Sequence, residues 1–417
     1  MVYVGVMGHG TVGSGVVEVL QKNADSIAKR AGVEIRIKKI LDLRDFPGLS
    51  YHHLFTRDVE DILGDPEIKI VVEVMGGINP AYAFTKRALE SGKHVVTSNK
   101  ELVAMHGAEL QRIARDHNAV YLFEASVGGG IPIIRPLKQC LAGNEIYEVT
   151  GILNGTTNYI LSEMKNKGKS FEDALADAQA MGYAERDPSA DIEGYDAQRK
   201  IAILSSIAFQ QHVRYTDIQT EGITDITKED MIYARELDYV IKLIARASKS
   251  EAGICAKVGP VLLPAGHPLA DVEDVFNGIL VKGDAIGDVM FYGRGAGKLP
   301  TASAVVGDII EASRLPGDAK NPVLYEETDP AVLNTEQTEC RFLIRIRTKD
   351  AVVLEREAEA LFPGVRIHVS RNPLLQGEAA ILTGKCLKEA EFEQKREALN
   401  ALSSVEAVIH TMRIMEV

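Results

Sequence analysis

The chain has 417 residues, of which 46% are hydrophobic and 25% charged, a composition typical of a globular protein with two or three domains. Its formal net charge of −12 disfavours binding to nucleic acid or to an anionic membrane surface. No apolar run approaches the roughly 18 residues that suggest a transmembrane helix, and the N-terminus lacks the features of a signal peptide. The cysteines are scattered and form no CxxC pair, so we expect reduced thiols in a cytoplasmic protein; they are Cys140, Cys255, Cys340 and Cys386.

Residues 1–128 alternate short apolar runs with segments of helical periodicity. Strands are expected at residues 2–7, 35–41, 68–75, 94–97 and 119–123. Between them, helices are expected from residue 12, where Val12, Val16 and Leu20 recur at helical spacing, and at residues 81–90 and 101–115. This alternation predicts an α/β domain with a Rossmann-type parallel sheet and right-handed crossovers.

The pattern changes after residue 128. Residues 129–318 predict a mixed α/β domain, with strands at residues 146–153, 239–248, 254–261, 279–284 and 289–292 and helices at residues 156–165, 171–180, 196–209 and 299–312. Its last helix is expected to pack back on the first domain. Residues 319–339 are polar, contain two prolines and predict a linker. Residues 340–417 have the β-α-β-β-α-β order of a ferredoxin-like domain, with elements at residues 340–348, 352–361, 365–370, 379–387, 391–402 and 405–415.

A glycine motif follows the first predicted strand. Residues 8–13 read Gly-His-Gly-Thr-Val-Gly and match G-x-G-x-x-G. Gly8 would make the tight turn, Gly10 would let the backbone approach a pyrophosphate, and Gly13 would let the helix pack on the strand. The helix N-terminus would then offer free N–H groups to the phosphates. Because the motif joins a strand to an amphipathic helix, it predicts a dinucleotide site.

The end of the second predicted strand bears on the choice of cofactor. Asp42 would accept hydrogen bonds from the ribose hydroxyls of NAD and repel the 2′-phosphate of NADP. Arg44, Lys38 and Lys39 lie close by and favour the phosphate. The balance favours NAD modestly over NADP.

Two lysines are candidates for proton transfer. Lys200 follows Asp196 by four residues, so both lie on one face if this segment is helical. Such a pair alone is most often an ordinary surface ion pair, which contributes only a few tenths of a kcal/mol. The same chain also carries a nucleotide-binding motif, and this favours a functional role for the pair. Lys100 adds to this, because it follows the fourth predicted strand, where doubly wound sheets bind ligands.

Several longer segments together resemble the homoserine dehydrogenases, in the long form with a C-terminal ACT-like domain. Residues 92–100 read Gly-Lys-His-Val-Val-Thr-Ser-Asn-Lys, and further matches lie at residues 124–132, 151–160, 182–188, 194–200 and 293–302. The resemblance implies reversible hydride transfer between L-homoserine and L-aspartate 4-semialdehyde with NAD(P), in the biosynthesis of threonine, methionine and isoleucine.

The resemblance also implies residue roles. Glu185 and Asp196 would supply carboxylates for the substrate ammonium, with Asp191 as a supporting acid. Lys200 would donate and accept the proton, since a partly desolvated lysine exchanges protons nearer neutral pH. Lys100 would lie at the junction of nicotinamide and substrate and share that role. Further cofactor contacts would be Thr11, Val12, Gly76, Ser98, Gly182 and Gly297.

A cation, an assembly and an effector follow from the same resemblance. A monovalent cation, usually sodium, would be held by the Glu124 carboxylate or backbone and by the carbonyls of Val127, Gly129 and Ile131. The second domain would form a homodimer or tetramer. L-threonine is a possible effector of the ACT-like domain, although residues 348–353 lack the Pro-Gly turn usual after the first strand of such domains.

Two alternatives remain. One is a different NAD(P)-dependent dehydrogenase, such as a sugar-acting enzyme, but those chains usually continue Glu-Lys-Pro where this one has Thr97-Ser98-Asn99-Lys100. The other is a non-catalytic NAD(P)-binding sensor, which would need the glycine loop but not all of the candidate lysines and acids together.

Overall fold

The computed structural model describes residues 1–315, 323–325, 332–333 and 338–415. The chain forms two compact units. Unit 1 comprises Met1–Val149, Arg199–Asp217 and Val281–Pro330, and unit 2 comprises Thr150–Gln198, Ile218–Leu280 and Ala331–Val417. Most of the predicted linker, including both of its prolines, lies outside the described residues, and the predicted three-domain division stays a prediction.

Unit 1 contains a six-stranded sheet in the order β3-β2-β1-β4-β5-β6. All neighbouring strands are parallel. The strands are β1 (Val2–Met7), β2 (Ile35–Leu41), β3 (Phe55–Thr56), β4 (Ile68–Glu73), β5 (His94–Thr97) and β6 (Tyr121–Leu122). Val4, Val6, Ile70 and Val72 are fully buried, as expected for central strands that are covered on both faces. The predicted Rossmann-type parallel sheet is confirmed.

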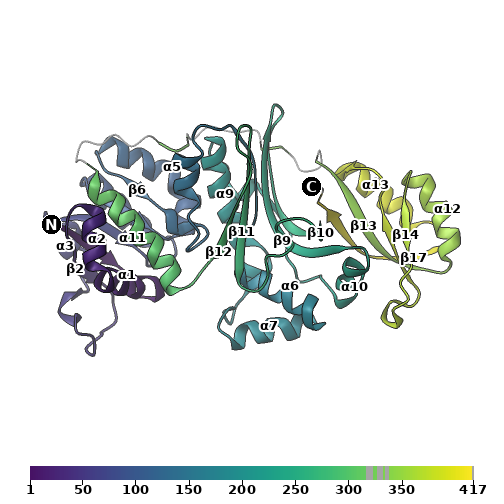
Figure 1. Cartoon of the computed structure of the whole chain (residues 1–417), viewed down its shortest axis with the longest axis horizontal. Helices are drawn as coiled ribbons and strands as arrows, with labels where there is room; N and C mark the ends of the chain where they lie inside the picture. The colour runs from purple at the N-terminus through teal and green to yellow at the C-terminus, as the bar shows by residue number, and fades with distance from the viewer. Residues whose placement is uncertain (316–322, 326–331, 334–337, 416–417) are drawn as a thin grey trace. The chain divides into compact units, whose positions relative to one another are not determined.

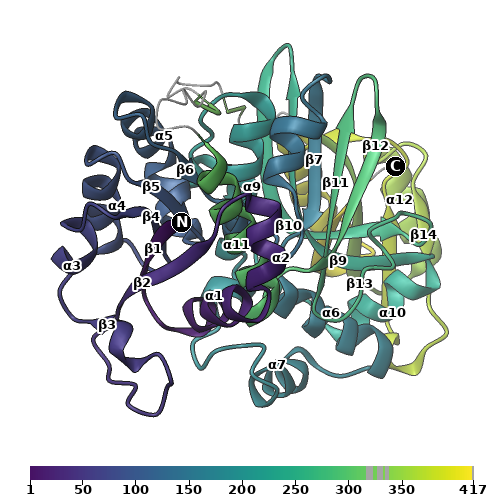
Figure 2. The same ribbon diagram turned by 60° about the vertical axis from the view of Figure 1, so that its left-hand side comes forward.

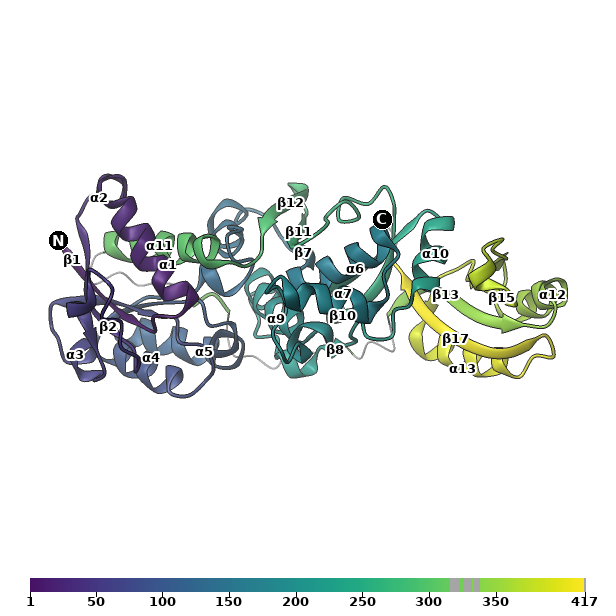
Figure 3. The same ribbon diagram turned by 90° about the horizontal axis from the view of Figure 1, so that it is seen from below.

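Helices cover both faces of this sheet (Figure 3). One face carries α1 (Thr11–Lys22), α2 (Ala24–Ala31) and α11 (Lys298–Arg314), and the other carries α3 (Glu60–Leu63), α4 (Ala81–Glu90) and α5 (Lys100–Asp116). Although α11 comes late in the chain, Val305 and Ile309 share one core with Val16 of α1. The two helices approach closely at Gly15, where an added Cβ would lie 2.8 Å from the carbonyl oxygen of Lys298.

Two strands of unit 1 are shorter than the sequence predicts. Strand β4 ends at Glu73 rather than Met75, because the chain turns away into Gly76 and Gly77, whose φ angles are +80° and +70°. Strand β6 contains only Tyr121 and Leu122, because a 3-10 turn at Glu124–Ser126 follows almost at once. The helices α2 and α3 were not predicted.

A larger mixed sheet has the order β12-β11-β7-β9-β10-β17-β13-β15-β14 along its main path. Its strands from the middle of the chain are β7 (Ile146–Ile152), β9 (Tyr239–Ser250), β10 (Gly253–Pro264), β11 (Phe276–Gly283) and β12 (Gly287–Arg294), and β8 (Gln219–Thr220) pairs with β10 beside this path. The helices here are α6 (Gly155–Lys167), α7 (Phe171–Ala180), α8 (Ser189–Ile192), α9 (Tyr195–Phe209) and α10 (Lys228–Glu236). Both α6 and α10 pack against β9 (Figure 2).

The C-terminal segment, yellow in Figure 1, contains β13 (Glu339–Thr348), α12 (Ala351–Leu361), β14 (Arg366–His368), β15 (Glu378–Leu382), β16 (Leu387–Lys388), α13 (Glu389–Asn400) and β17 (Val405–Ile414). Apart from the short β16, this is the predicted β-α-β-β-α-β order. Stacked rings of Phe342 and Phe392, with centroids 3.6 Å apart, lie in its core.

The C-terminal segment is not an isolated module within unit 2. Strand β17 pairs in parallel with β10, with Arg413 opposite Val261 and Ile414 opposite Leu262. The larger sheet therefore runs from the middle of the chain directly into the C-terminal segment. Across the described residues, the helices are all too short or too polar to cross a membrane.

Candidate active site

The glycine loop joins β1 to α1 in the geometry that its spacing predicts. Gly8 has a φ of +102°, and a Cβ on Gly13 would lie 2.0 Å from the carbonyl oxygen of Gly8. Gly10 is open on the side where a Cβ would stand, with no atom within 4 Å. Helix α1 then starts at Thr11 without a side-chain cap and without an acidic residue in its first turn. An open loop before an uncapped helix N-terminus fits the pyrophosphate of a dinucleotide.

Asp42, directly after β2, holds this loop and is itself held by Arg44. Its carboxylate accepts hydrogen bonds from the backbone N–H of His9 at 2.8 Å and from the Arg44 Nε and Nη2, both at 2.9 Å. The Arg44 guanidinium therefore holds the pKa of Asp42 well below its usual range. Because the Arg44 side chain is 62% exposed, it could turn from the carboxylate to a ligand.

A cavity lies beside the loop, with His9 on its wall. The His9 ring packs edge-on against the rings of Phe46, Tyr51 and Phe55. Burial lowers the pKa of His9, so its imidazole is neutral near pH 7. The cavity is lined by His9, Ser14, Glu18, Gln21, Lys22, Leu49, Tyr51 and Lys298.

A buried hydrogen-bond network that we did not predict shapes the ends of β4 and β5. The carboxylate of Glu73 accepts the Thr97 hydroxyl at 2.6 Å and the backbone N–H of Met75 at 2.9 Å. Asn99 donates to the carbonyl of Gly77 at 2.6 Å and caps α5. Burial raises the pKa of Glu73. The signal for this network was an acidic residue that ends an apolar strand.

The other predicted cofactor residues of unit 1 lie at turns that favour close approach. Gly76 has a φ of +80° and open space where a Cβ would stand. The backbone N–H of Ser98 points at the carbonyl of Glu73, and Lys100 is the first residue of α5. Gly297, with a φ of +121°, precedes α11. Gly10, Asp42, Gly76 and Ser98 all follow the carboxyl ends of neighbouring parallel strands, where ligands bind in such sheets.

In unit 2, Asn154 brings two of the predicted substrate acids together. Its Nδ2 donates to Asp191 at 2.7 Å and to Asp196 at 2.8 Å. The Asn154 Oδ1 accepts the backbone N–H of Thr157 at 2.9 Å, so the same side chain caps α6. Glu185 lies on the loop between α7 and α8, and it is exposed.

Helix α9 carries Asp196 in its first turn and Lys200 one turn later. Both side chains are buried, with Asp196 2% and Lys200 8% exposed. Helical periodicity puts them on one face, as the sequence predicted. Burial of both residues argues against an ordinary surface ion pair. Gly182, the predicted cofactor contact of unit 2, has a φ of +73° after α7.

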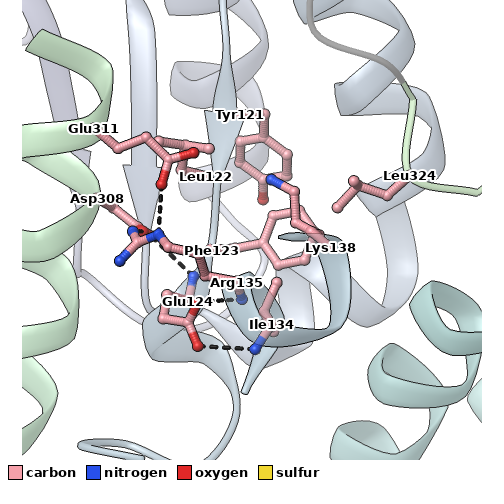
Figure 4. Close-up of a pocket in the computed structure, with 10 residues that line it drawn as sticks. All are labelled: Tyr121, Leu122, Phe123, Glu124, Ile134, Arg135, Lys138, Asp308, Glu311 and Leu324. Atoms are coloured by element: carbon pink, nitrogen blue, oxygen red, sulfur yellow. Dashed lines mark hydrogen bonds and ion pairs between the residues drawn. The ribbon is translucent and has the colours of Figure 1, made fainter. Parts of the chain in front are cut away.

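The predicted cation loop uses the carboxylate of Glu124 for another purpose. One carboxylate oxygen accepts the backbone N–H groups of Ile133 and Ile134 at 2.7 and 2.8 Å, and the other accepts that of Arg135 at 2.6 Å. Figure 4 shows Glu124 beside Ile134 and Arg135. The carboxylate thus caps the helical turn that continues as a π-helix at Pro136–Cys140. The described residues contain no group of three or more His, Cys, Asp and Glu side chains suited to a metal.

Burial and close backbone contacts hold the remaining residues of this loop in place. Val127 and Ile131 are buried, and the Ile131 N–H donates to the carbonyl of Gly128 at 2.8 Å. Gly129 has a φ of +52°, and a Cβ there would lie 2.4 Å from the carbonyl oxygen of Gly295. Only glycine fits this position.

Arg135 ties the same loop to α11. Its guanidinium donates to Asp308 and Glu311, each at 2.6 Å (Figure 4). Asp308 also accepts the backbone N–H of Glu124 at 2.9 Å. Burial raises the pKa of Asp308 to about 8, the Glu124 charge adds to the rise, and Arg135 opposes it. The loop after β6 is therefore fixed by two buried carboxyl groups, those of Glu124 and Asp308.

Comparison with known proteins identifies the family. The family model described as the NAD-binding domain of homoserine dehydrogenase matches residues 8–124, and the model described as homoserine dehydrogenase matches residues 132–310. A homoserine dehydrogenase of Pseudomonas aeruginosa is 40% identical over 98% of this chain and 96% of its own length.

Solved structures agree with this match. A homoserine dehydrogenase from Thiobacillus denitrificans is 38% identical, with a TM-score of 0.91 over 100% of this chain and 98% of that one. A hyperthermophilic archaeal homoserine dehydrogenase mutant in complex with NADPH is 29% identical, with a TM-score of 0.64 over 76% of this chain and 99% of that one. With the glycine loop and its sheet in place, this chain belongs to the homoserine dehydrogenases, a family of NAD(P)-dependent oxidoreductases.

Proposed function

We propose that the chain catalyses reversible hydride transfer between L-homoserine and L-aspartate 4-semialdehyde, with NAD(P) as the hydride carrier. The observation that carries the proposal is the pair of carboxylates held by Asn154, one of them a helical turn before the buried Lys200. Homoserine has an ammonium group that needs carboxylates and a hydroxyl that needs a proton acceptor. This combination also favours an enzyme over a dinucleotide sensor.

The substrate ammonium would bind to Asp196 and Asp191. Asn154 fixes the orientation of both carboxylates, so their negative charges are already positioned for the ammonium before the substrate binds. Glu185 is exposed on the loop before α8, and we propose that it joins the two acids as a third partner of the ammonium. Gly182 in the same loop would contact the cofactor.

Proton transfer would fall to Lys200, whose Nζ would accept the hydroxyl proton of homoserine and return it in the reverse direction. Its burial favours this role, because the Nζ can meet the substrate hydroxyl away from bulk water. Lys100, at the start of α5, would share the role from the carboxyl end of the parallel sheet. When bound, NAD(P) would supply the acceptor for the hydride that leaves the substrate carbon.

The dinucleotide would lie on the glycine loop. Gly8, Gly10 and Gly13 would let the pyrophosphate approach, with Thr11 and Val12 contributing the first backbone N–H groups of α1. Gly76, Ser98 and Gly297 would complete the cofactor contacts.

The adenosine end would accept both NAD and NADP. With NAD, the Asp42 carboxylate would accept the ribose hydroxyls, as the sequence favours. With NADP, Arg44 would turn from Asp42 toward the 2′-phosphate, a movement that its exposure permits. Support for NADP comes from the archaeal relative described as a complex with NADPH.

The loop at residues 127–131 would hold a sodium ion through backbone carbonyls of Glu124, Val127, Gly129 and Ile131. We assign this role to the Glu124 backbone rather than its carboxylate, because the carboxylate already accepts three backbone N–H groups. We further propose a homodimer or tetramer built on residues 129–318 of a cytoplasmic protein, with residues 1–128 binding the cofactor.

Residues 340–417 would form the ACT-like domain, and L-threonine is its candidate effector. Asp350 follows the first strand of this domain. Its carboxylate caps α12 by accepting the backbone N–H groups of Val352 and Val353 at 2.8 and 3.1 Å. In ACT-like domains the turn that follows the first strand usually contains Pro-Gly and helps to bind the effector, but residues 348–353 lack it. We expect weak inhibition by L-threonine, tested by titration of activity.

The role of Lys200 is tested with Lys200→Ala. We expect the variant to keep its fold and its affinity for cofactor and to lose most turnover of L-homoserine, by a factor of about 10² or more. Binding is read by titration of the cofactor and turnover by absorbance of the reduced nicotinamide. Turnover close to that of the wild type would remove Lys200 from this role.

A further inference from the structure

A cluster of charged side chains joins the C-terminal segment to the part of unit 2 that carries the substrate acids. Arg413, on β17, donates from Nε and Nη2 to Glu389 at 2.8 and 3.2 Å. Its Nη1 donates to Glu221 at 2.7 Å. Lys257 of β10 donates to Glu389 at 2.6 Å and completes the cluster. Arg413 therefore uses separate guanidinium nitrogens for two carboxylates, one in the C-terminal segment and one outside it.

Glu221 directly follows β8 and is fixed on the backbone side as well. Its N–H donates to the carbonyl of Val258 at 2.9 Å, which extends the pairing of β8 with β10. Its side chain is 42% exposed, and the hydrogen bond to Arg413 restrains it from one side. Arg413 therefore restrains the point at which the chain leaves β8.

The next two residues are packed against the end of α8. The N–H of Ile223 donates to the carbonyl of Ile192 at 2.8 Å. A Cβ on Gly222 would lie 2.4 Å from that same carbonyl oxygen and 2.9 Å from the Cα of Glu193. The backbones of these two segments therefore touch directly, and a shift in one displaces the other.

The contacted segment is the one that carries the substrate acids. Asp191 lies in α8 immediately before Ile192, and Asn154 links it to Asp196 by the two hydrogen bonds at 2.7 and 2.8 Å. Gly194, between the two acids, has a φ of +83°, and a Cβ there would lie 2.9 Å from the Thr220 side chain. The turn between the acids is therefore packed against β8 itself.

We propose that Arg413 is a positioning residue for the substrate acids, acting through Glu221 and the contact of residues 222–223 with Ile192. The C-terminal domain thereby helps to set the geometry of Asp191 and Asp196. This inference rests on the proposed function, in which those two acids bind the substrate ammonium. It assigns the C-terminal segment a part in substrate affinity that does not depend on an effector.

The test compares Glu221→Gln and Arg413→Lys with the wild type in the full chain. We expect each variant to raise the KM for L-homoserine about tenfold, since small displacements of positioning groups cost this much or more. The KM for NAD(P) and the thermal midpoint should change little, and kcat should stay within about twofold. The double variant should be no worse than the singles, because both remove the same link.

Arg396→Lys is the matched control. Arg396 lies on α13, lines the same cavity as Arg413 and pairs with Glu393 at 2.7 Å, so it has a comparable charge in the same domain. Its substitution should leave the KM for L-homoserine unchanged. Hydrogen exchange gives a second readout without activity, because Glu221→Gln should speed exchange at the Ile223 amide.

Unchanged KM values for L-homoserine in both variants, with normal wild-type turnover, would overturn the inference and leave the proposed function intact. Equal rises in KM for substrate and cofactor would also overturn it, because they would indicate general loosening. An absence of homoserine turnover by the wild-type protein would instead remove the proposed function, and this inference with it.

Discussion

The Glu124 carboxylate offers the sharpest test of how the loop after β6 is built. Replacement by glutamine keeps the size of the side chain and one of its two oxygens. That oxygen can still accept from Ile133 and Ile134, now as a neutral acceptor. The new amide group, however, faces the N–H of Arg135, which the carboxylate accepts at 2.6 Å. Glu124→Gln therefore removes one hydrogen bond to a charged acceptor and leaves two donors, the glutamine NH2 and the Arg135 N–H, facing each other.

The expected cost follows from these contacts. The lost bond to a charged acceptor is worth about 1.5–3 kcal/mol, and weakening of the other two adds about 1 kcal/mol. The site is 4% exposed, so water does not replace the lost partner. Part of the loss is offset because Asp308 no longer faces a second carboxylate. We expect Glu124→Gln to lower the free energy of unfolding by about 3 kcal/mol.

Urea unfolding followed by circular dichroism measures this free energy, with Glu311→Gln as the matched control. Glu311 accepts from the same Arg135 at 2.6 Å but is 23% exposed, so its loss should cost less than about 1 kcal/mol. A sodium titration of activity accompanies both variants. If Glu124→Gln were as stable as the wild type and lost only its response to sodium, the carboxylate would be a cation ligand and our assignment would be refuted.

Three further predictions concern cofactor choice, pH and the C-terminal segment. Arg44→Ala should lower kcat/KM for NADP+ about tenfold, equivalent to about 1.4 kcal/mol, with a smaller change for NAD+; equal losses would contradict a phosphate-binding role. Burial lowers the pKa of Lys242 to about 8 from its usual 10.5, so the unfolded chain binds more protons between these values and stability should rise with pH there. Between pH 7.5 and pH 10, the free energy of urea unfolding should rise by about 2.4 kcal/mol more in the wild type than in Lys242→Met, and parallel pH dependences would contradict this. Removal of all residues after 338 should yield a protein that elutes as aggregates on size exclusion. The deletion exposes the edge of β10 that pairs with β17, and it removes Arg345, which lies 3.1 Å from the buried Asp230. A monodisperse, fully active product would contradict this prediction.

Local patterns in the sequence predicted most of the architecture. The period of the apolar residues separates strands from helices, and the glycine spacing at residues 8–13 identifies the nucleotide loop. Helix α10 was missed although its start carries a signal, since Thr227 and Asp230 form a reciprocal capping box. Pairing of β17 with β10 left no local signal, because it joins residues about 150 positions apart.

In the candidate site, too, local patterns predicted which residues take part but not the contacts that they make. Asp42 was predicted as a cofactor residue from its place after a strand, but its clamp by Arg44 depends on how the two side chains fold over each other. Glu124 was predicted as a possible cation ligand, yet its carboxylate turns to backbone groups nine to eleven residues later. Asn154 was not predicted to join Asp191 and Asp196, which lie 37 and 42 residues further on. The contacts of Glu124 and Asn154 depend on tertiary structure that local patterns do not reveal, whereas the Asp42–Arg44 clamp is local and depends on side-chain conformation.

The most direct test of the proposed reaction is the absorbance of reduced nicotinamide when the purified wild-type protein is mixed with L-homoserine and NAD+ or NADP+ in sodium-containing buffer. The account predicts steady formation of the reduced cofactor with at least one of the two, and none with 2-aminobutyrate, which lacks the hydroxyl that loses its proton to Lys200. No reduction with either cofactor, or equal reduction with the analogue, would contradict the account.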